Sequence, residues 1–376
     1  MNPNSSRPQP SDAAPVPAGH RPILLVPYMW IGDFVRCHSV VRLLNQRAPG
    51  RPIDVITTTL CAPLLDYMPG VRAGIICDLP RRRLALSDHF ALARRLRTAN
   101  YGSALIMPRT WKAALAPFLA GIPERIGFAG EARFVLLSDL RFGERKLPRM
   151  IDRCGALALP KGAPLPAEWP LPELKVPLAE AQAWRARRKL DDDGRPVIAF
   201  APGAVGPSKR WPVAAYAEVA RQLTAQGFSV WILGSPNEAP LAADIARVAG
   251  PRARDFTSSD LRNAILALKL AHAAVSNDSG LLHVAAAIGT PSIGIFGPTS
   301  PWHWAPLNPL AATIETCAQL PCRPCHKPTC RLEHHRCMRD IPPQQVLAAV
   351  RQALANTRPK EDEGALRPSG SPGTTS

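Results

Sequence analysis

The sequence predicts an α/β protein made of two doubly wound domains that face a central cleft. Its 376 residues exceed one ordinary hydrophobic core and suit two domains. A hydrophobic content of 46% indicates a globular chain. Buried strands alternate with helices in two separate series, which is the pattern of parallel sheets covered by helices. In such folds ligands bind at the carboxyl ends of the strands.

The first series begins with "ILLVPYMWIGD" over residues 23–33, which we interpret as a buried strand that breaks into a loop. The following "FVRCHSVVRLLNQR" has helical spacing, and "PIDVITT" is the next strand. Further parallel strands are expected in "AGIICDLP" and "SALIMP". This series predicts the first Rossmann-like domain.

A Pro-rich stretch over residues 160–177 and the charged segment that ends at Gly194 interrupt the pattern. We therefore predict a first domain over residues 21–172, a linker over 173–194 and a second domain over 195–356. The terminal segments 1–20 and 357–376 lack the hydrophobic content of a core and are predicted to be disordered.

The second series opens with the strand "PVIAFAPGA". A helix near residues 213–226, the strand "SVWILG" and a helix near residues 261–271 follow it. This order repeats the pattern of the first domain.

The stretch "SNDSGLLHVAAAIGTPSIGIFGPTS" over residues 276–300 closes this series. We expect a strand over 270–275, a helix over 281–288 and another strand over 292–296. The polar residues 276–280 then form the turn into the helix, where free amides and the positive end of the dipole suit an anion such as phosphate. In the alternative interpretation, Asp278 or Ser279 only caps a buried helix.

The formal net charge of +17 points to an anionic partner, which includes nucleic acid, a phosphorylated substrate or an acidic membrane surface. General basicity of an Arg-rich composition is the alternative. No nucleic-acid-binding motif accompanies the charge. Neither half carries G-x-G-x-x-G or G-x-x-x-x-G-K-[ST], which disfavours dinucleotide oxidoreductases and nucleoside triphosphatases.

Membrane insertion is not expected, because no apolar run reaches the ~18–20 residues that span a bilayer. The N-terminal segment has no hydrophobic centre and does not read as a signal peptide. We therefore expect a cytoplasmic protein whose nine cysteines stay mostly reduced.

Several separated motifs together resemble the ADP-heptose:lipopolysaccharide heptosyltransferases. They are "WIGD", the segment over residues 109–141, "PGAVGPSKRWP", "LGSPNE" and "NDSGLLHVAAAIGTPSIGIFGPTSP". The resemblance covers about residues 21–356. The forms "GPSKRWP" and "GIPERIGFAGE" are more similar to the heptosyltransferase II branch than to the branch that adds the first heptose.

The resemblance implies the GT-B architecture, in which two Rossmann-like domains face a cleft. It also implies an inverting glycosyltransferase that moves L-glycero-D-manno-heptose from ADP-heptose to the lipopolysaccharide inner core, with the second heptose favoured. Such an enzyme needs no cofactor or metal, and works as a peripheral protein on the anionic inner face of the inner membrane. The alternatives are a related transferase with another nucleotide sugar and a catalytically silent sugar- or lipid-binding scaffold.

By the same resemblance, Asp33 occupies the position of the catalytic base, while its other interpretation is the N-cap of a helix that starts at Phe34. Lys209 would neutralise the donor diphosphate, where a solvated loop lysine is the alternative. The remaining donor-site positions complete the cleft: Ser279, Gly280, Leu281 and His283 for the phosphates, Asp278 for a heptose hydroxyl, and Glu238 for the ribose hydroxyls.

Basic residues of the first domain are candidates for the acceptor. Lys112 is expected to meet the acceptor or a sugar hydroxyl, and Arg125, Arg133 and the run Arg81-Arg82-Arg83 to meet phosphates of the lipopolysaccharide core. Arginine runs are also commonly just solvated surface, which is the alternative for these residues.

A cysteine-rich segment follows the last motif, with the spacing Cys322-x2-Cys325-x4-Cys330-x6-Cys337. The first pair has the spacing of zinc ligands, but the remainder matches no common zinc ribbon. Structural zinc and free or redox-sensitive thiols both remain open at this point. Because some members of the resembled family have this segment and others lack it, the exact acceptor preference is open too.

Overall fold

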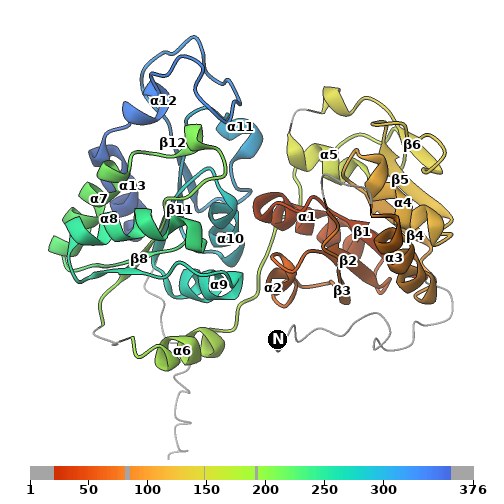
Figure 1. The fold of residues 1–376 in the computed structure, drawn as a ribbon, viewed down its shortest axis with the longest axis horizontal. Coiled ribbons are helices and arrows are strands. Elements are labelled where there is room, and N and C mark those ends of the chain that lie inside the picture. The colour runs from red at the N-terminus through yellow and green to blue at the C-terminus, as the bar shows by residue number, and fades with distance from the viewer. Residues whose placement is uncertain (1–20, 81–84, 148, 191–193, 357–376) are drawn as a thin grey trace, which may run out of the picture.

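The computed structural model describes residues 21–80, 85–147, 149–190 and 194–356. The terminal segments predicted to be disordered and the run Arg81-Arg82-Arg83 lie outside these residues. Two bodies stand side by side in Figure 1, the first in red to yellow and the second in green to blue.

Each body is built on a six-stranded sheet, and every strand pairing in both sheets is parallel. The strands of the first sheet are ordered β3-β2-β1-β4-β5-β6 and those of the second β12-β11-β10-β7-β8-β9. When the second order is read backwards, its strands follow one another as those of the first sheet do, and this is the Rossmann order. The predicted α/β fold class with two doubly wound domains is confirmed.

The strands of the first sheet are β1 (Ile23–Val26), β2 (Ile53–Thr57), β3 (Ala73–Ile76), β4 (Ser103–Ile106), β5 (Glu124–Phe128) and β6 (Asp139–Arg141). Its helices are α1 (Ile31–Arg47), α2 (Ala62–Leu65), α3 (Leu86–Thr98), α4 (Trp111–Leu119) and α5 (Met150–Ala156).

The strands of the second sheet are β7 (Val197–Ala201), β8 (Ser229–Ile232), β9 (Ala253–Asp255), β10 (Ala273–Asn277), β11 (Ser292–Ile295) and β12 (Ala311–Ile314). The helices that follow the first domain are α6 (Leu178–Arg187), α7 (Val213–Ala225), α8 (Ala239–Ala249), α9 (Leu261–Leu270), α10 (Gly280–Ile288), α11 (Pro301–Trp304), α12 (Arg336–Arg339) and α13 (Pro343–Asn356).

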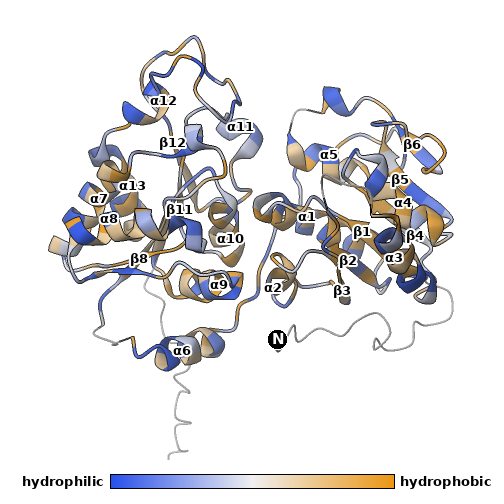
Figure 2. Ribbon diagram, in the orientation of Figure 1, coloured by the Kyte–Doolittle hydropathy of each residue, from blue (hydrophilic) through white to orange (hydrophobic). Residues whose placement is uncertain are grey.

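Six of the eight inner strands are buried along their whole length, and β5 and β8 are partly exposed at their first residues. Every residue of β1, β2, β4, β7, β10 and β11 is buried. Helices cover both faces of each sheet, so these strands are near-continuous apolar runs rather than alternating ones. Figure 2 shows the hydrophobic colour on β1 and α10, while hydrophilic turns lie on peripheral helices such as α12.

The strand order reverses between β1 and β4 in the first sheet and between β7 and β10 in the second. Helix α1 follows β1 and helix α10 follows β10, so one helix starts at each reversal point. These two helices face one another between the domains (Figure 1). Because ligands of doubly wound sheets bind at such reversal points, the fold brings both candidate sites to the contact between α1 and α10, which we call the cleft side.

The start of α1 and the start of α10 approach so closely that neither has room for a side chain. A Cβ added to Gly32 would lie 2.6 Å from Cδ2 of His283, and one added to Gly280 would lie 2.7 Å from Cβ of Ile31. Gly280, a residue of the predicted phosphate site, is therefore also constrained by packing between the domains. Its missing side chain makes room for the other domain.

The local structure around Asp33 differs from the expectation of a loop. Helix α1 begins at Ile31 with Trp30 at the N-cap position, so Asp33 is the third residue of the helix. It is therefore neither a loop residue nor an N-cap. A carboxylate in the first turn is favourable there because it faces the positive end of the helix dipole.

A second contact between the domains involves the segment after residue 171. The backbone N–H of Leu174 donates to the carbonyl of Ala287 (2.8 Å), and that of Lys175 donates to the carbonyl of Tyr67 (2.8 Å). Helix α6 then packs on α9, where the indole of Trp184 donates to Asn263 (2.8 Å). We call this contact the hinge side; the exact domain limits remain a prediction.

Within the described residues, no helix is both long enough and apolar enough to cross a bilayer.

Candidate active site

Asp33 lies at the cleft with its carboxylate held by Arg36, one turn further along α1. Nη1 of Arg36 donates to Oδ1 of Asp33 at 2.6 Å. Burial raises the pKa of the Asp33 carboxyl above its usual value, and the negative charge of Asp278 raises it further. The positive charges of Arg36 and Lys209 lower this pKa, but the net shift is upward. A carboxylate with a raised pKa is a better proton acceptor, which suits a general base.

Lys209 comes from the second domain and reaches the same region. It ends the short 3-10 helix η3 (Pro207–Lys209) in the loop after β7. Its ammonium contacts Oδ2 of Asp278 at 2.7 Å, and the hydroxyl of Thr299 donates to the same oxygen at 2.8 Å. Because Asp278 is buried and Lys209 is about one third exposed, the ammonium stands at the cleft surface.

The start of α10 lies beside Asp278. Ser279 is at the N-cap position, but its side chain makes no capping hydrogen bond to the helix. Its hydroxyl instead pairs with the hydroxyl of Ser276 at 3.0 Å. The interpretation of this turn as an ordinary side-chain cap is therefore wrong for Ser279. The amides at Gly280 and Leu281 keep the orientation that binds anions at helix N-termini.

His283 lies one turn into α10 and is 5% exposed. Its Nε2 is 2.9 Å from Nη2 of Arg36. Burial lowers the pKa of His283 well below its usual value, and the cations of Arg36 and Lys209 add to this. The structure therefore places a neutral His283 in the contact between the domains, beside the predicted phosphate site.

Glu238 lies in the second domain at the end of the 3-10 helix η4 (Pro236–Glu238). Its Oε2 accepts hydrogen bonds from the backbone N–H and the hydroxyl of Ser235 at 2.7 and 2.6 Å. This is a capping box, so the helix-start interpretation of Glu238 holds. The same side chain lies against Gly203, in the loop after β7 that also leads to Lys209.

The cysteine-rich segment braces the loop that carries Lys209. The backbone N–H of Ser208 donates to the carbonyl of Pro328 (3.1 Å) and its hydroxyl to the carbonyl of Lys327 (2.5 Å). The charges of Lys209 and Asp278 both influence the pKa of His326, which burial lowers. This segment is therefore a wall of the second-domain site.

The cysteines of this segment are free thiols, and Sγ of Cys322 lies 3.8 Å from Nε2 of His334. Burial raises the pKa of Cys337, and the neighbouring Cys325, Cys330 and Cys322 raise it further. Among the residues that the structure describes, no group of three or more His, Cys, Asp or Glu has an arrangement that could hold a metal ion.

Two of the predicted acceptor residues, Arg125 and Arg133, form hydrogen bonds with backbone carbonyls of the first domain. Arg133 is 1% exposed and donates to the carbonyls of Phe128 and Pro108. Arg125 donates to the carbonyls of Leu136, Ile122 and Pro123. These guanidinium groups satisfy loop carbonyls that the chain would otherwise bury without partners. We therefore do not carry Arg125 or Arg133 into the proposed acceptor site.

Lys112 lies in the first turn of α4, after the carboxyl end of β4. It is half-buried, and its charge lowers the pKa of His89 after the larger effect of burial. Lys112 thus lies at the carboxyl edge of the first sheet, and its contact with the acceptor stays a prediction.

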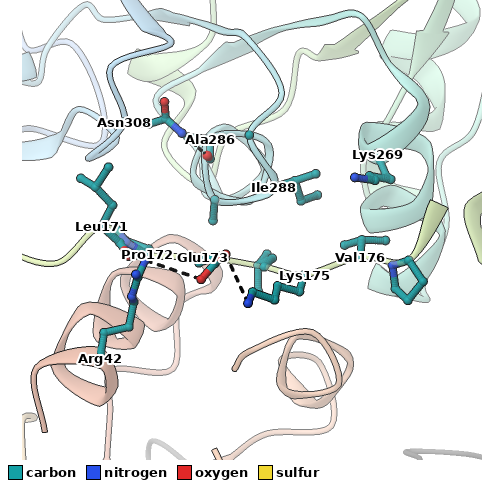
Figure 3. Close-up of a pocket in the computed structure, with 14 residues that line it drawn as sticks. Arg42, Leu171, Pro172, Glu173, Lys175, Val176, Lys269, Ala286, Ile288 and Asn308 are labelled. Atoms are coloured by element: carbon teal, nitrogen blue, oxygen red, sulfur yellow. Dashed lines mark hydrogen bonds and ion pairs between the residues drawn. The ribbon is translucent and has the colours of Figure 1, made fainter. Parts of the chain in front are cut away.

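A cavity of ≈ 550 Å³ lies on the hinge side, away from these residues (Figure 3). It is lined by the linker, the last turn of α10, Arg42 of α1 and Lys269 of α9. Glu173 lies between Arg42 and Lys175 at 3.6 and 3.9 Å. None of the predicted site residues lines this cavity, so it belongs to the hinge.

Three residues at the cleft escaped the sequence reasoning: Arg36, Thr299 and Trp304. Arg36 had a detectable signal, because residues three apart in a helix are neighbours and Asp33 precedes it by three. Thr299 and Trp304 had none, since their partners lie far away in the sequence.

Two facing Rossmann-like domains, each built on a parallel six-stranded sheet, have the GT-B architecture of glycosyltransferases. The sequence pattern of glycosyltransferase family 9 (heptosyltransferase) matches residues 89–336. The chain belongs to this family.

Full-length relatives support this assignment. Lipooligosaccharide heptosyltransferase 2 of Haemophilus influenzae is 34% identical over 346 residues, which cover 89% of this chain and 99% of that protein. Lipopolysaccharide heptosyltransferase 2 of Escherichia coli is also 34% identical, over 88% of this chain and 98% of that protein. The solved structure of E. coli ADP-heptose lps heptosyltransferase II superposes with a TM-score of 0.78 at 33% identity, covering 89% and 98%.

Proposed function

We propose that this glycosyltransferase moves L-glycero-D-manno-heptose from ADP-heptose to the lipopolysaccharide inner core, where it adds the second heptose. One observation carries the proposal. Asp33 of the first domain lies near enough to Lys209 and Asp278 of the second for their charges to shift its pKa. These residues lie where the strand order of each sheet reverses. A base and a phosphate-binding cation on opposite walls of one cleft are what a glycosyl transfer needs.

In the proposed reaction, Asp33 takes the proton from the acceptor hydroxyl while the oxygen of that hydroxyl bonds to the anomeric carbon. The bond from that carbon to the diphosphate breaks, and ADP leaves with the bonding electrons. Attack opposite to the leaving group inverts the anomeric centre. Asp33 afterwards loses the proton to water, which restores the base.

The donor diphosphate is proposed to lie against Lys209 and the start of α10. Its negative charge would draw the ammonium of Lys209 away from Asp278, its partner at 2.7 Å. The amides at Gly280 and Leu281 would bind the phosphates at the positive end of the helix dipole. Once Lys209 has moved away, Asp278 would accept a hydrogen bond from a hydroxyl of the heptose. Glu238 would accept the ribose hydroxyls.

The acceptor is proposed to approach from the first domain, with Lys112 as the candidate contact. The net charge of +17 favours a phosphorylated lipid at an anionic surface. We therefore propose a cytoplasmic enzyme that works as a peripheral protein at the inner face of the inner membrane.

A donor panel tests the function. The purified protein is incubated with lipopolysaccharide truncated after the first heptose, and separately with the heptose-free core, each with ADP-heptose or another nucleotide sugar. Transfer of heptose to the first acceptor supports the proposal. Transfer from another nucleotide sugar would show a related transferase, and absence of transfer from every donor would show a silent scaffold.

A further inference from the structure

Arg36 is a buried arginine whose guanidinium contacts both domains. It is 4% exposed. Nη1 donates to Oδ1 of Asp33 at 2.6 Å, within its own helix. Nη2 contacts Nε2 of His283 at 2.9 Å and donates to the carbonyl of Trp304 at 2.5 Å. The guanidinium also lies over the ring of Trp304, 5.3 Å from its centroid.

The direction of each hydrogen bond follows from the chemistry of arginine. A guanidinium stays charged in proteins and can only donate. Nε2 of His283 must therefore accept, which puts the ring proton of the neutral histidine on Nδ1. Burial and the two nearby cations keep the pKa of His283 low, in agreement with this assignment. Arg36 is thus fixed to the second domain by two acceptors and an aromatic face.

The charge around Asp33 depends on Arg36. The other charged groups that face the carboxylate are Lys209 and Asp278, which are themselves paired with one another. The tyrosine and thiol nearby, Tyr28 and Cys37, have pKa values that burial raises, so both are neutral at pH 7. His283 is neutral as well. Arg36 is therefore the main cation that lowers the pKa of this half-buried carboxyl.

We propose that Arg36 is the positioning residue of the catalytic base. It donates a hydrogen bond to Oδ1 of Asp33 and is itself held in place by His283 and Trp304 of the second domain. The hydrogen bond that Asp33 receives in the described part of the chain ends on Oδ1. Oδ2 is then the oxygen presented to the acceptor hydroxyl. This inference rests on the proposed function, because it presupposes that Asp33 is the base.

The experiment measures heptose transfer across pH for the parent enzyme, Arg36→Met and Arg36→Lys. Arg36→Met removes the charge that lowers the pKa of Asp33, so that pKa rises. We expect the acid limb of the kcat/KM profile to move up by at least about one pH unit, since an opposite charge at this distance is worth about that much. Arg36→Lys keeps the charge but not the fork of donors, so its acid limb should stay near that of the parent while its turnover falls.

Arg47→Met is the matched control, because Arg47 is an exposed arginine at the end of the same helix. It should leave the profile unchanged. ADP-heptose affinity and melting temperature of each variant report whether it is folded. An unshifted acid limb in folded Arg36→Met, while the parent transfers heptose and Asp33→Asn does not, would overturn the role of Arg36 alone. An inactive parent, or an active Asp33→Asn, would instead overturn the proposed function.

Discussion

The two contacts between the domains have different partners. On the cleft side, Arg36 joins α1 to His283 and Trp304, and its remaining donor holds the proposed base. On the hinge side, Arg262 of α9 pairs with Asp66 and Glu180 and lies over the ring of Tyr67. There the linker backbone also bonds to both domains. Each contact centres on one arginine, the buried Arg36 on the cleft side and the half-buried Arg262 on the hinge side, but only the first includes groups of the proposed reaction.

The difference indicates a division of work. In the hinge-side cluster the charged groups pair with one another, and Tyr67 also donates to Glu180 at 2.7 Å. The cleft-side cluster ends on the carboxylate of Asp33 and on His283 and Trp304 of the second domain. Substitutions at the cleft should therefore change chemistry, and substitutions at the hinge should change stability. The following predictions test this separation, from the largest expected effect on transfer to the smallest.

Asp33→Asn should lower turnover by at least ~10²-fold and leave ADP-heptose affinity nearly unchanged, as for the loss of a general base. Calorimetric donor titration beside a rate assay measures both. Asp88→Asn is the control, because Asp88 is likewise the third residue of its helix but is exposed. If Asp33→Asn turned over like the parent, Asp33 would only stabilise the start of α1.

Lys209→Ala should weaken ADP-heptose binding as well as lower the rate, because the diphosphate is charged in both the ground and the transition state. A lost charged hydrogen bond corresponds to roughly a 10- to 100-fold weaker Kd. Lys161→Ala is the control, since Lys161 has a long, exposed ion pair at 3.9 Å. Equal ADP-heptose affinity in Lys209→Ala and the parent would remove Lys209 from the phosphate site.

Arg262→Met should act on stability rather than on chemistry. It would leave Asp66 buried without its cation, which costs about 3 kcal/mol in comparable buried pairs. We expect a clearly lower melting temperature but near-parental kcat at low temperature. Arg247→Met, which breaks an exposed ion pair with Asp244, should cost less than about 1 kcal/mol. A large loss of kcat in folded Arg262→Met would break the division between hinge and cleft.

The smallest expected effect concerns salt. If the charge of +17 attracts a phosphorylated acceptor, its long-range field is screened over ~8–10 Å. The acceptor KM should then rise between low and high salt, while the ADP-heptose KM should change much less. Binding to anionic vesicles should weaken over the same salt range. Two parallel curves of small slope would mean that the charge is compositional.

Sequence patterns were sufficient for the architecture because buried parallel strands are recognisable as apolar runs. The predicted strand at 292–296 and helix at 281–288 differ from β11 and α10 by one residue at one end. The strand predicted at 270–275 instead occupies residues 273–277, because α9 continues to Leu270. The turn at Asp33 was also misplaced, since α1 begins at Ile31 without a side-chain cap.

The site was predictable only where a motif identified it. Asp33, Lys209 and Asp278 gather as the resemblance implied, although their roles stay predictions. Arg133 shows why the rest failed. From sequence, an arginine that follows a strand is interpreted as a surface cation. Only the fold shows that Arg133 is buried and donates to the carbonyls of Phe128 and Pro108. The spacing from Asp33 could have indicated Arg36, but not its partner His283, which lies 247 residues away in the other domain.

The glycines at the meeting point of α1 and α10 have a consequence for anyone who engineers this enzyme. The side-chain positions of Gly32 and Gly280 face the other domain, so an alanine at either position would push the two domains apart. Such a shift would spread the base and the leaving-group site by a fraction of a bond length while leaving every reactive group intact. Libraries that vary specificity should therefore keep these two positions as glycine, because the absence of both side chains sets the distance between α1 and α10.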